Sequence, residues 1–130
     1  MRVLLLEDEQ AQADCLAMIL GDAGYSMAVA YDVPQALESA RSRRPDIVLT
    51  DLCVKGASGL ECLLRLYEEL GPIQTIVITG LPRDHQTVVD AIKQLHCQVM
   101  QKPVDIGSLL SLMKSPLLWL ADGERRLHAG

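Results

Sequence analysis

A short apolar run that ends in a single carboxylate constrains the fold of this chain more than any other stretch. Residues 47–50 read Ile-Val-Leu-Thr and are followed directly by Asp51. A continuous apolar run with β-branched members is typical of a strand buried on both faces of a parallel sheet. Asp51 would then lie at the carboxyl end of that strand, where open α/β sheets bind ligands. We therefore expect Asp51 to serve chemistry rather than packing.

The rest of the chain alternates between short apolar runs and segments with helical periodicity. Strands are predicted over 3–6, 27–31, 47–50, 75–79 and 97–101. Helices are predicted over about 10–23, 33–44, 58–70, 84–95 and 105–113. Five strands that alternate with five helices through short loops predict an α/β fold with a doubly wound parallel sheet.

Acidic residues mark the expected starts of several helices. Asp32 stands before the second helical segment and is a good N-cap residue. Asp84 and Asp105 are expected to open the fourth and fifth helices in the same way. Residues 52–57 are predicted to form a loop.

Composition excludes several classes of protein. Apolar residues make up 49% of 130 residues, which predicts one globular domain rather than a disordered chain. The net charge of −5 argues against direct binding of nucleic acid or an anionic membrane surface. The sequence has no apolar run near the roughly 20 residues that a membrane span needs. Acids follow the N-terminus too soon for a signal peptide, so we expect a cytoplasmic protein.

The four cysteines, Cys15, Cys53, Cys62 and Cys97, are scattered and form no C-x-x-C pair. This spacing argues against a zinc site or a disulfide framework. We expect reduced thiols that are mostly buried as small apolar residues.

Polar residues follow four of the five predicted strands. Glu7 and Asp8 follow the first strand, Asp51 the third, Thr79 ends the fourth, and Lys102 follows the fifth. Each residue alone is compatible with an ordinary solvated loop. Because the carboxyl ends of parallel strands share one edge, the set predicts a site there.

In these residues the chain resembles a response-regulator receiver domain of two-component signalling. The matching positions are Glu7–Asp8, Asp51, Gly59, Thr79 and Lys102–Pro103. The resemblance covers about residues 2–114 and implies a flavodoxin-like (CheY-like) sheet of strand order 2-1-3-4-5, with a cis Lys102–Pro103 bond. Residues 1–114 would form the receiver domain. Residues 115–130 would be a C-terminal extension or a linker to an output domain.

The resemblance implies a Mg²⁺ site, with Mn²⁺ as an alternative ion. Its ligands would be Asp8, Asp51 and the backbone carbonyl of Cys53, with Glu7 acting through water. The physical argument agrees, because two carboxylates about 4 Å apart repel by roughly 4 kcal/mol at an effective dielectric near 20. A hard divalent cation relieves this repulsion and leaves room for a phosphoryl oxygen.

The resemblance also implies that Asp51 accepts a phosphoryl group from a histidine kinase or a small phosphodonor. Lys102 would contact a phosphoryl oxygen and Thr79 would donate its hydroxyl. Such a domain catalyses its own phosphorylation and dephosphorylation without being a conventional turnover enzyme. Cys53 and Leu81 offer no base or water-orienting amide, which predicts slow self-dephosphorylation.

The implied partners are a histidine kinase or phosphotransfer protein and a downstream output domain or protein. The surface around residues 84–105 would carry the signal. A homodimer through the fourth helix, fifth strand and fifth helix, or through the tail, is compatible with this role. The apolar cluster 117–120 predicts either a closing turn or a dimer or linker segment.

The sequence departs from the family on the output side. Val99 stands where the family usually has an aromatic residue, and Leu95-His96 replaces a usual Gly-Ala. These departures keep open an alternative, a receiver-fold docking module that works without phosphoryl transfer. A dinucleotide-binding domain is disfavoured because acids, not glycines, follow the first strand. An aspartyl phosphohydrolase is disfavoured because Cys53 stands where a second acid is common.

Overall fold

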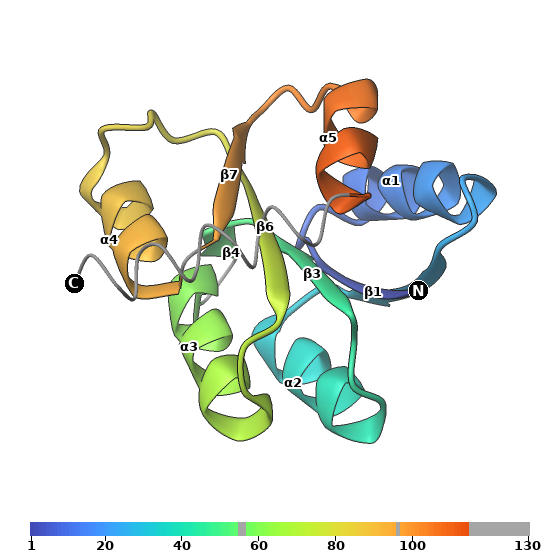
Figure 1. Cartoon of the computed structure of the whole chain (residues 1–130), viewed down its shortest axis with the longest axis horizontal. Coiled ribbons are helices and arrows are strands. Elements are labelled where there is room, and N and C mark those ends of the chain that lie inside the picture. Colours follow the sequence, from blue (N-terminus) through green and yellow to red (C-terminus); the bar gives the residue numbers. More distant parts are fainter. Residues whose placement is uncertain (55–56, 96, 115–130) are drawn as a thin grey trace.

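The computed structural model describes residues 1–54, 57–95 and 97–114, with the backbone alone described at 53, 54 and 57–59. The strands are β1 (Arg2–Leu6), β2 (Ser26–Ala30), β3 (Ile47–Thr50), β4 (Cys53–Val54), β5 (Ala57–Ser58), β6 (Gln74–Thr79) and β7 (Gln98–Gln101). The helices are α1 (Gln10–Asp22), α2 (Val33–Ser42), α3 (Gly59–Leu70), α4 (Gln86–Leu95) and α5 (Ile106–Met113). Figure 1 shows their arrangement.

A five-stranded sheet of order β2-β1-β3-β6-β7 forms the middle layer of the molecule. Every neighbouring pair in it is parallel. Counted along this sheet alone, the order is 2-1-3-4-5, so the prediction of a doubly wound parallel sheet is confirmed. The Lys102–Pro103 peptide bond is cis, as expected.

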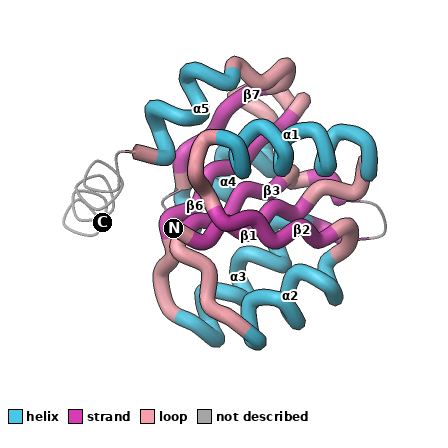
Figure 2. Tube along the Cα trace, turned by 90° about the vertical axis from the view of Figure 1, so that its right-hand side faces the viewer, coloured by secondary structure: helices cyan, strands magenta, loops and turns pink. Residues whose placement is uncertain are grey.

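Helices cover both faces of the sheet, with α1 and α5 on one face and α2, α3 and α4 on the other (Figures 1 and 2). Successive side chains of β1 pack alternately on the two faces of the sheet, as the pleat of a strand requires. Val3 and Leu5 belong to the cluster beneath α1 and α5. Leu4 and Leu6 belong to the cluster beneath α2, α3 and α4. All four are at most 2% exposed, which explains why this strand is apolar without interruption.

Capping agrees with the sequence at α2 and differs at α4. The Asp32 carboxylate accepts a hydrogen bond from the Gln35 amide at 2.8 Å, as predicted for an N-cap. Helix α4 begins only at Gln86, so Asp84 is not its cap. Instead, Nδ1 of His85 accepts from the Thr87 amide at 3.2 Å. The turn that pairs the His85 amide with the Pro82 carbonyl delays the helix start.

Helix α5 begins after Asp105, as predicted, but the carboxylate does not bind a backbone amide. It accepts a hydrogen bond from the Ser108 hydroxyl at 2.5 Å instead. Residues 52–57, predicted as a loop, contain most of a small antiparallel hairpin of β4 and β5. Strands of two residues are too short to leave a period in the sequence.

The prediction of reduced, mostly buried cysteines agrees with the three cysteines whose side chains the structure describes. Cys62 and Cys97 are free and buried, whereas Cys15 is free but exposed on α1. Burial raises the pKa of the Cys62 thiol to about 11. No helix in the described part of the chain is long and apolar enough to cross a membrane. His96 and the predicted extension 115–130 lie outside the described residues.

Candidate functional site

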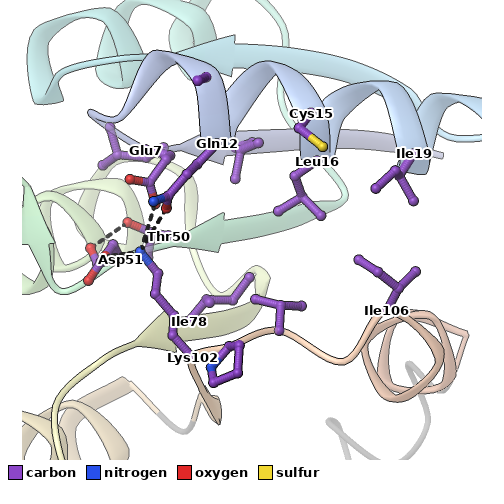
Figure 3. A pocket seen from close by; sticks show the side chains of 15 residues that line it. Glu7, Gln12, Cys15, Leu16, Ile19, Thr50, Asp51, Ile78, Lys102 and Ile106 are labelled. Carbon is purple, nitrogen blue, oxygen red and sulfur yellow. Dashed lines mark hydrogen bonds and ion pairs between the residues drawn. The ribbon is translucent and has the colours of Figure 1, made fainter.

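The carboxyl ends of β1, β3 and β7 bring Glu7, Asp51 and Lys102 together (Figure 3). The Lys102 ammonium lies 2.9 Å from Oδ2 of Asp51 and 3.2 Å from Oε2 of Glu7. A third oxygen, Oε1 of Gln12, lies 3.5 Å from the same nitrogen. Three side-chain oxygens, from Glu7, Gln12 and Asp51, therefore surround this one ammonium.

The backbone holds these residues in place because the hydrogen bonding between neighbouring strands continues one residue past the strand ends. The Glu7 amide donates to the Ala30 carbonyl at 3.1 Å, and the Asp51 amide donates to the Leu6 carbonyl at 3.3 Å. The Lys102 amide donates to the Thr79 carbonyl at 2.8 Å. The three side chains thus start from the rigid edge of the sheet rather than from free loops.

The site is nearly closed to water on its acidic side. Glu7 is 7% exposed and Asp51 is 8% exposed, so both carboxylates depend on protein partners for solvation. Burial by itself lowers the pKa of Lys102, but the hydrogen bonds and charges of Asp51 and Glu7 outweigh it and raise that pKa above its usual value. Two carboxylates against one ammonium leave a formal excess of one negative charge.

Thr79 ends β6 beside the backbone of Lys102 and is fully buried. Its Oγ1 accepts a hydrogen bond from the Leu81 amide at 3.1 Å, so the hydroxyl oxygen is held by its own loop. The structure thus places Thr79 on the edge that carries Lys102.

Gln12 is a member of the site that sequence reasoning missed. It lies in the first turn of α1, which starts three residues after Glu7. Because that helix begins just beyond the sheet edge, side chains of its first turn can overhang the site. A polar residue in the first helical turn after Glu7 was the signal in the sequence that could have identified Gln12.

The donor set fits a hard cation. Within residues 1–54, 57–95 and 97–114, no three His, Cys, Asp or Glu side chains form a ready-made metal cage. Mg²⁺ usually takes only one or two protein carboxylates, and waters and phosphate oxygens complete its shell. Glu7 and Asp51 already direct oxygens at one cation, the Lys102 ammonium. Ligation by Asp8 and by the Cys53 carbonyl stays a prediction.

A mostly apolar groove of about 750 Å³ runs from this site along α1. Leu16 and Ile19 of α1 line one side and Ile106 of α5 lines the other (Figure 3). The exposed thiol of Cys15 also lies on its wall. The charged residues therefore form one end of a larger hollow.

Comparisons with known proteins agree on one family. The model of the response regulator receiver domain matches residues 3–114. The phosphoglycerate transport system transcriptional regulatory protein PgtA of Salmonella typhimurium is 31% identical over 115 residues, which is 88% of this chain and 28% of PgtA. The DNA-binding response regulator MtrA of Mycolicibacterium paratuberculosis is 29% identical over 116 residues, 89% of this chain and 51% of MtrA. The chain thus spans about a quarter to a half of these curated relatives.

Solved structures share the fold over nearly the whole chain. The signal receiver domain of an HD domain-containing protein from Pseudomonas fluorescens Pf-5 is 25% identical, with a TM-score of 0.82 over 99% of this chain and 98% of that one. A CheY-like receiver domain protein from Methanospirillum hungatei JF-1 gives a TM-score of 0.83 at 22% identity, over 99% and 98% of the two chains.

Proposed function

Because the chain belongs to the response regulator receiver domain family, we propose that it is a phosphorylation-driven signalling switch whose phosphoryl acceptor is Asp51. Domains of this family act in two-component, phosphorylation-based signalling. The observation that carries the assignment is the Lys102 ammonium between Asp51 and Glu7 at the sheet edge. A carboxylate nucleophile with a cation beside it is what phosphoryl transfer requires.

In the proposed reaction a carboxylate oxygen of Asp51 attacks phosphorus. The new O–P bond forms as the bond from phosphorus to the donor breaks, and the donor leaves with the electron pair. The donor is a phosphohistidine of a histidine kinase or phosphotransfer protein, or a small acyl phosphate. Lys102, whose ammonium lies 2.9 Å from Oδ2 of Asp51, would bind an equatorial phosphoryl oxygen. The catalysis is mostly positioning and charge neutralisation.

Asp8, Asp51 and the Cys53 carbonyl would hold Mg²⁺, or Mn²⁺ in its place, with Glu7 acting through water. When bound, the ion supplies positive charge against the incoming phosphoryl oxygens. Glu7 and Asp51 support this assignment because both are buried oxygen donors that share one cation. Lys102 would then turn from these carboxylates toward the phosphoryl group.

Thr79 would donate its hydroxyl to the phosphoryl group and draw its loop with it. Phosphorylation adds about 1.5–2 negative charges, a local change that can shift a bistable element. The surface around residues 84–105 would carry this shift to a partner. With residues 115–130 as extension or linker, the receiver unit would act in the cytoplasm through an output domain or a separate protein. PgtA and MtrA are named as transcriptional and DNA-binding regulators.

Incubation with acetyl phosphate and MgCl₂, followed by intact mass measurement, tests this function. We expect the wild type to gain one phosphoryl group and Asp51→Asn to gain none. Asp22→Asn, which changes an exposed carboxylate at the far end of α1, is the matched control and should behave as wild type. An adduct on Asp51→Asn would refute the acceptor assignment. No adduct on the wild type, with partner binding intact, would support the docking module instead.

A further inference from the structure

The loop after β6 is tied to β7 by a chain of hydrogen bonds that passes through Gln101. This residue ends β7 and directly precedes Lys102. Its side-chain Nε2 donates to the Leu81 carbonyl at 2.8 Å. The Leu81 amide donates in turn to Oγ1 of Thr79 at 3.1 Å. Both polar backbone atoms of Leu81 are therefore held, one by Gln101 and one by Thr79.

Two further hydrogen bonds join the same two segments. The Lys102 amide donates to the Thr79 carbonyl at 2.8 Å, and an Arg83 nitrogen lies 3.4 Å from the Val99 carbonyl. The bond from Gln101 differs from these because it runs from a side chain of β7 to a backbone carbonyl within the loop. Val99 is buried and has no polar side-chain atom, so its side chain cannot form such a link.

We propose that Gln101 is a positioning residue that holds the Thr79 loop in its unphosphorylated arrangement and sets how readily the loop moves. The inference rests on the proposed function of Asp51 and Thr79. If Thr79 swings toward a phosphoryl group, the Leu81 amide must release its oxygen or follow it. Either movement strains the bond from Gln101 to the Leu81 carbonyl. An interaction made in only one of two states biases the equilibrium toward that state.

Gln101→Leu removes the hydrogen-bond donor while keeping side-chain size and net charge nearly unchanged. In the unmodified protein we expect the Leu81 amide to exchange with solvent about fivefold faster, the factor that fits the loss of one ordinary hydrogen bond. Beryllofluoride with Mg²⁺, as the phosphoryl mimic, should bind the variant about fivefold more tightly because the hydrogen bond to the Leu81 carbonyl no longer has to be broken. Gln94→Leu, at an exposed glutamine of α4, is the matched control and should change neither quantity.

Gln101→Lys provides a rescue, because an ammonium can also donate to the Leu81 carbonyl. Exchange of the Leu81 amide should return toward the wild-type rate, and Gln94→Lys controls for the added charge. Unchanged exchange in Gln101→Leu, or weaker beryllofluoride binding, would overturn the role of Gln101. If wild type binds no beryllofluoride and takes no phosphoryl group, the proposed function fails. Faster exchange in Gln101→Leu would then identify Gln101 as a loop anchor only.

Discussion

At the scale of single residues, Lys102 connects the side chains of the site. Its ammonium contacts Asp51, Glu7 and Gln12, and it partly balances two carboxylates that have almost no access to water. Removing a partner from a buried charged group costs more than the pair contributes, because the remaining group stays desolvated. The stability of the unphosphorylated protein therefore depends on this lysine, and so does the proposed reaction.

We expect Lys102→Met to lower the free energy of unfolding by about 1–3 kcal/mol at pH 7 without metal. MgCl₂ should stabilise the variant more than the wild type, because a divalent ion can take the place of the lost ammonium. Urea unfolding with and without MgCl₂ measures both effects. Lys93→Met, at an exposed lysine of α4, is the matched control. Equal stability of Lys102→Met and wild type without metal would contradict the role of the ammonium.

The same pair predicts a pH dependence with a definite sign. The folded pKa of Lys102 is raised, so the unfolded chain loses this proton first as pH increases. The stabilisation by the pair is complete below the unfolded pKa, near 10.4, and is lost as pH rises through the folded pKa. The stability difference between wild type and Lys102→Met should therefore be constant from pH 7 to about 9 and shrink above about pH 10.4.

At the scale of elements, Tyr67 joins α3, β6 and α4. Its hydroxyl lies 2.9 Å from the Ile73 carbonyl, 3.0 Å from the Thr75 hydroxyl and 3.0 Å from the Leu95 carbonyl. A phenol has one proton to donate, so only one of the carbonyls receives it at a time. The Thr75 hydroxyl, 2.8 Å from the Ile73 carbonyl oxygen, can donate a hydrogen bond to that oxygen while Tyr67 donates to the Leu95 carbonyl. The end of α4 is thus anchored to its neighbours by one half-buried hydroxyl group.

Tyr67→Phe should lower the free energy of unfolding by about 1 kcal/mol at pH 7, through loss of this hydrogen bond. Burial raises the pKa of Tyr67 to about 12, from 10.0 for the free group. The unfolded chain therefore ionises first, and wild-type stability should fall as pH rises from about 10 to 12. Thermal unfolding across this range should show a shallower fall in Tyr67→Phe. Tyr25→Phe, at a half-buried tyrosine, is the control, and an equal slope in wild type and Tyr67→Phe would contradict the assignment.

The sequence predicted the large elements well and their local details less well. Buried strands such as β3, all four of whose residues are buried, leave a nearly continuous apolar run in the sequence. The cap of α4 was missed because His85 rarely takes the role that Asp84 suggests, and the turn before the helix depends on tertiary context. The contact between Gln12 and Lys102 joins residues 90 positions apart and leaves no local pattern.

At the scale of the whole molecule, the strands of the sheet and the helices that the structure describes within residues 1–114 end by Met113. The described members of the two apolar clusters, one on each face, all precede Lys114. We expect these described elements to fold without the residues that follow. This is the structural basis for proposing residues 1–114 as the receiver domain.

We expect a chain ending at Lys114 to keep the far-ultraviolet circular dichroism of the full chain per residue of the domain. Its midpoint of thermal unfolding should lie within about 4 °C of the full chain, a shift equivalent to less than roughly 1 kcal/mol for a domain of this size. It should also accept a phosphoryl group from acetyl phosphate as the full chain does. Loss of cooperative unfolding in the shorter chain would show that residues 115–130 are part of the domain.

An ammonium between Glu7 and Asp51 gives the protein an internal counterion of its own. Removal of divalent ions should therefore prevent the proposed phosphorylation without unfolding the protein. Under the proposed function, the Lys102 ammonium would first have to leave Glu7 and Asp51, and the free energy of that step would set how readily a phosphodonor reacts with Asp51.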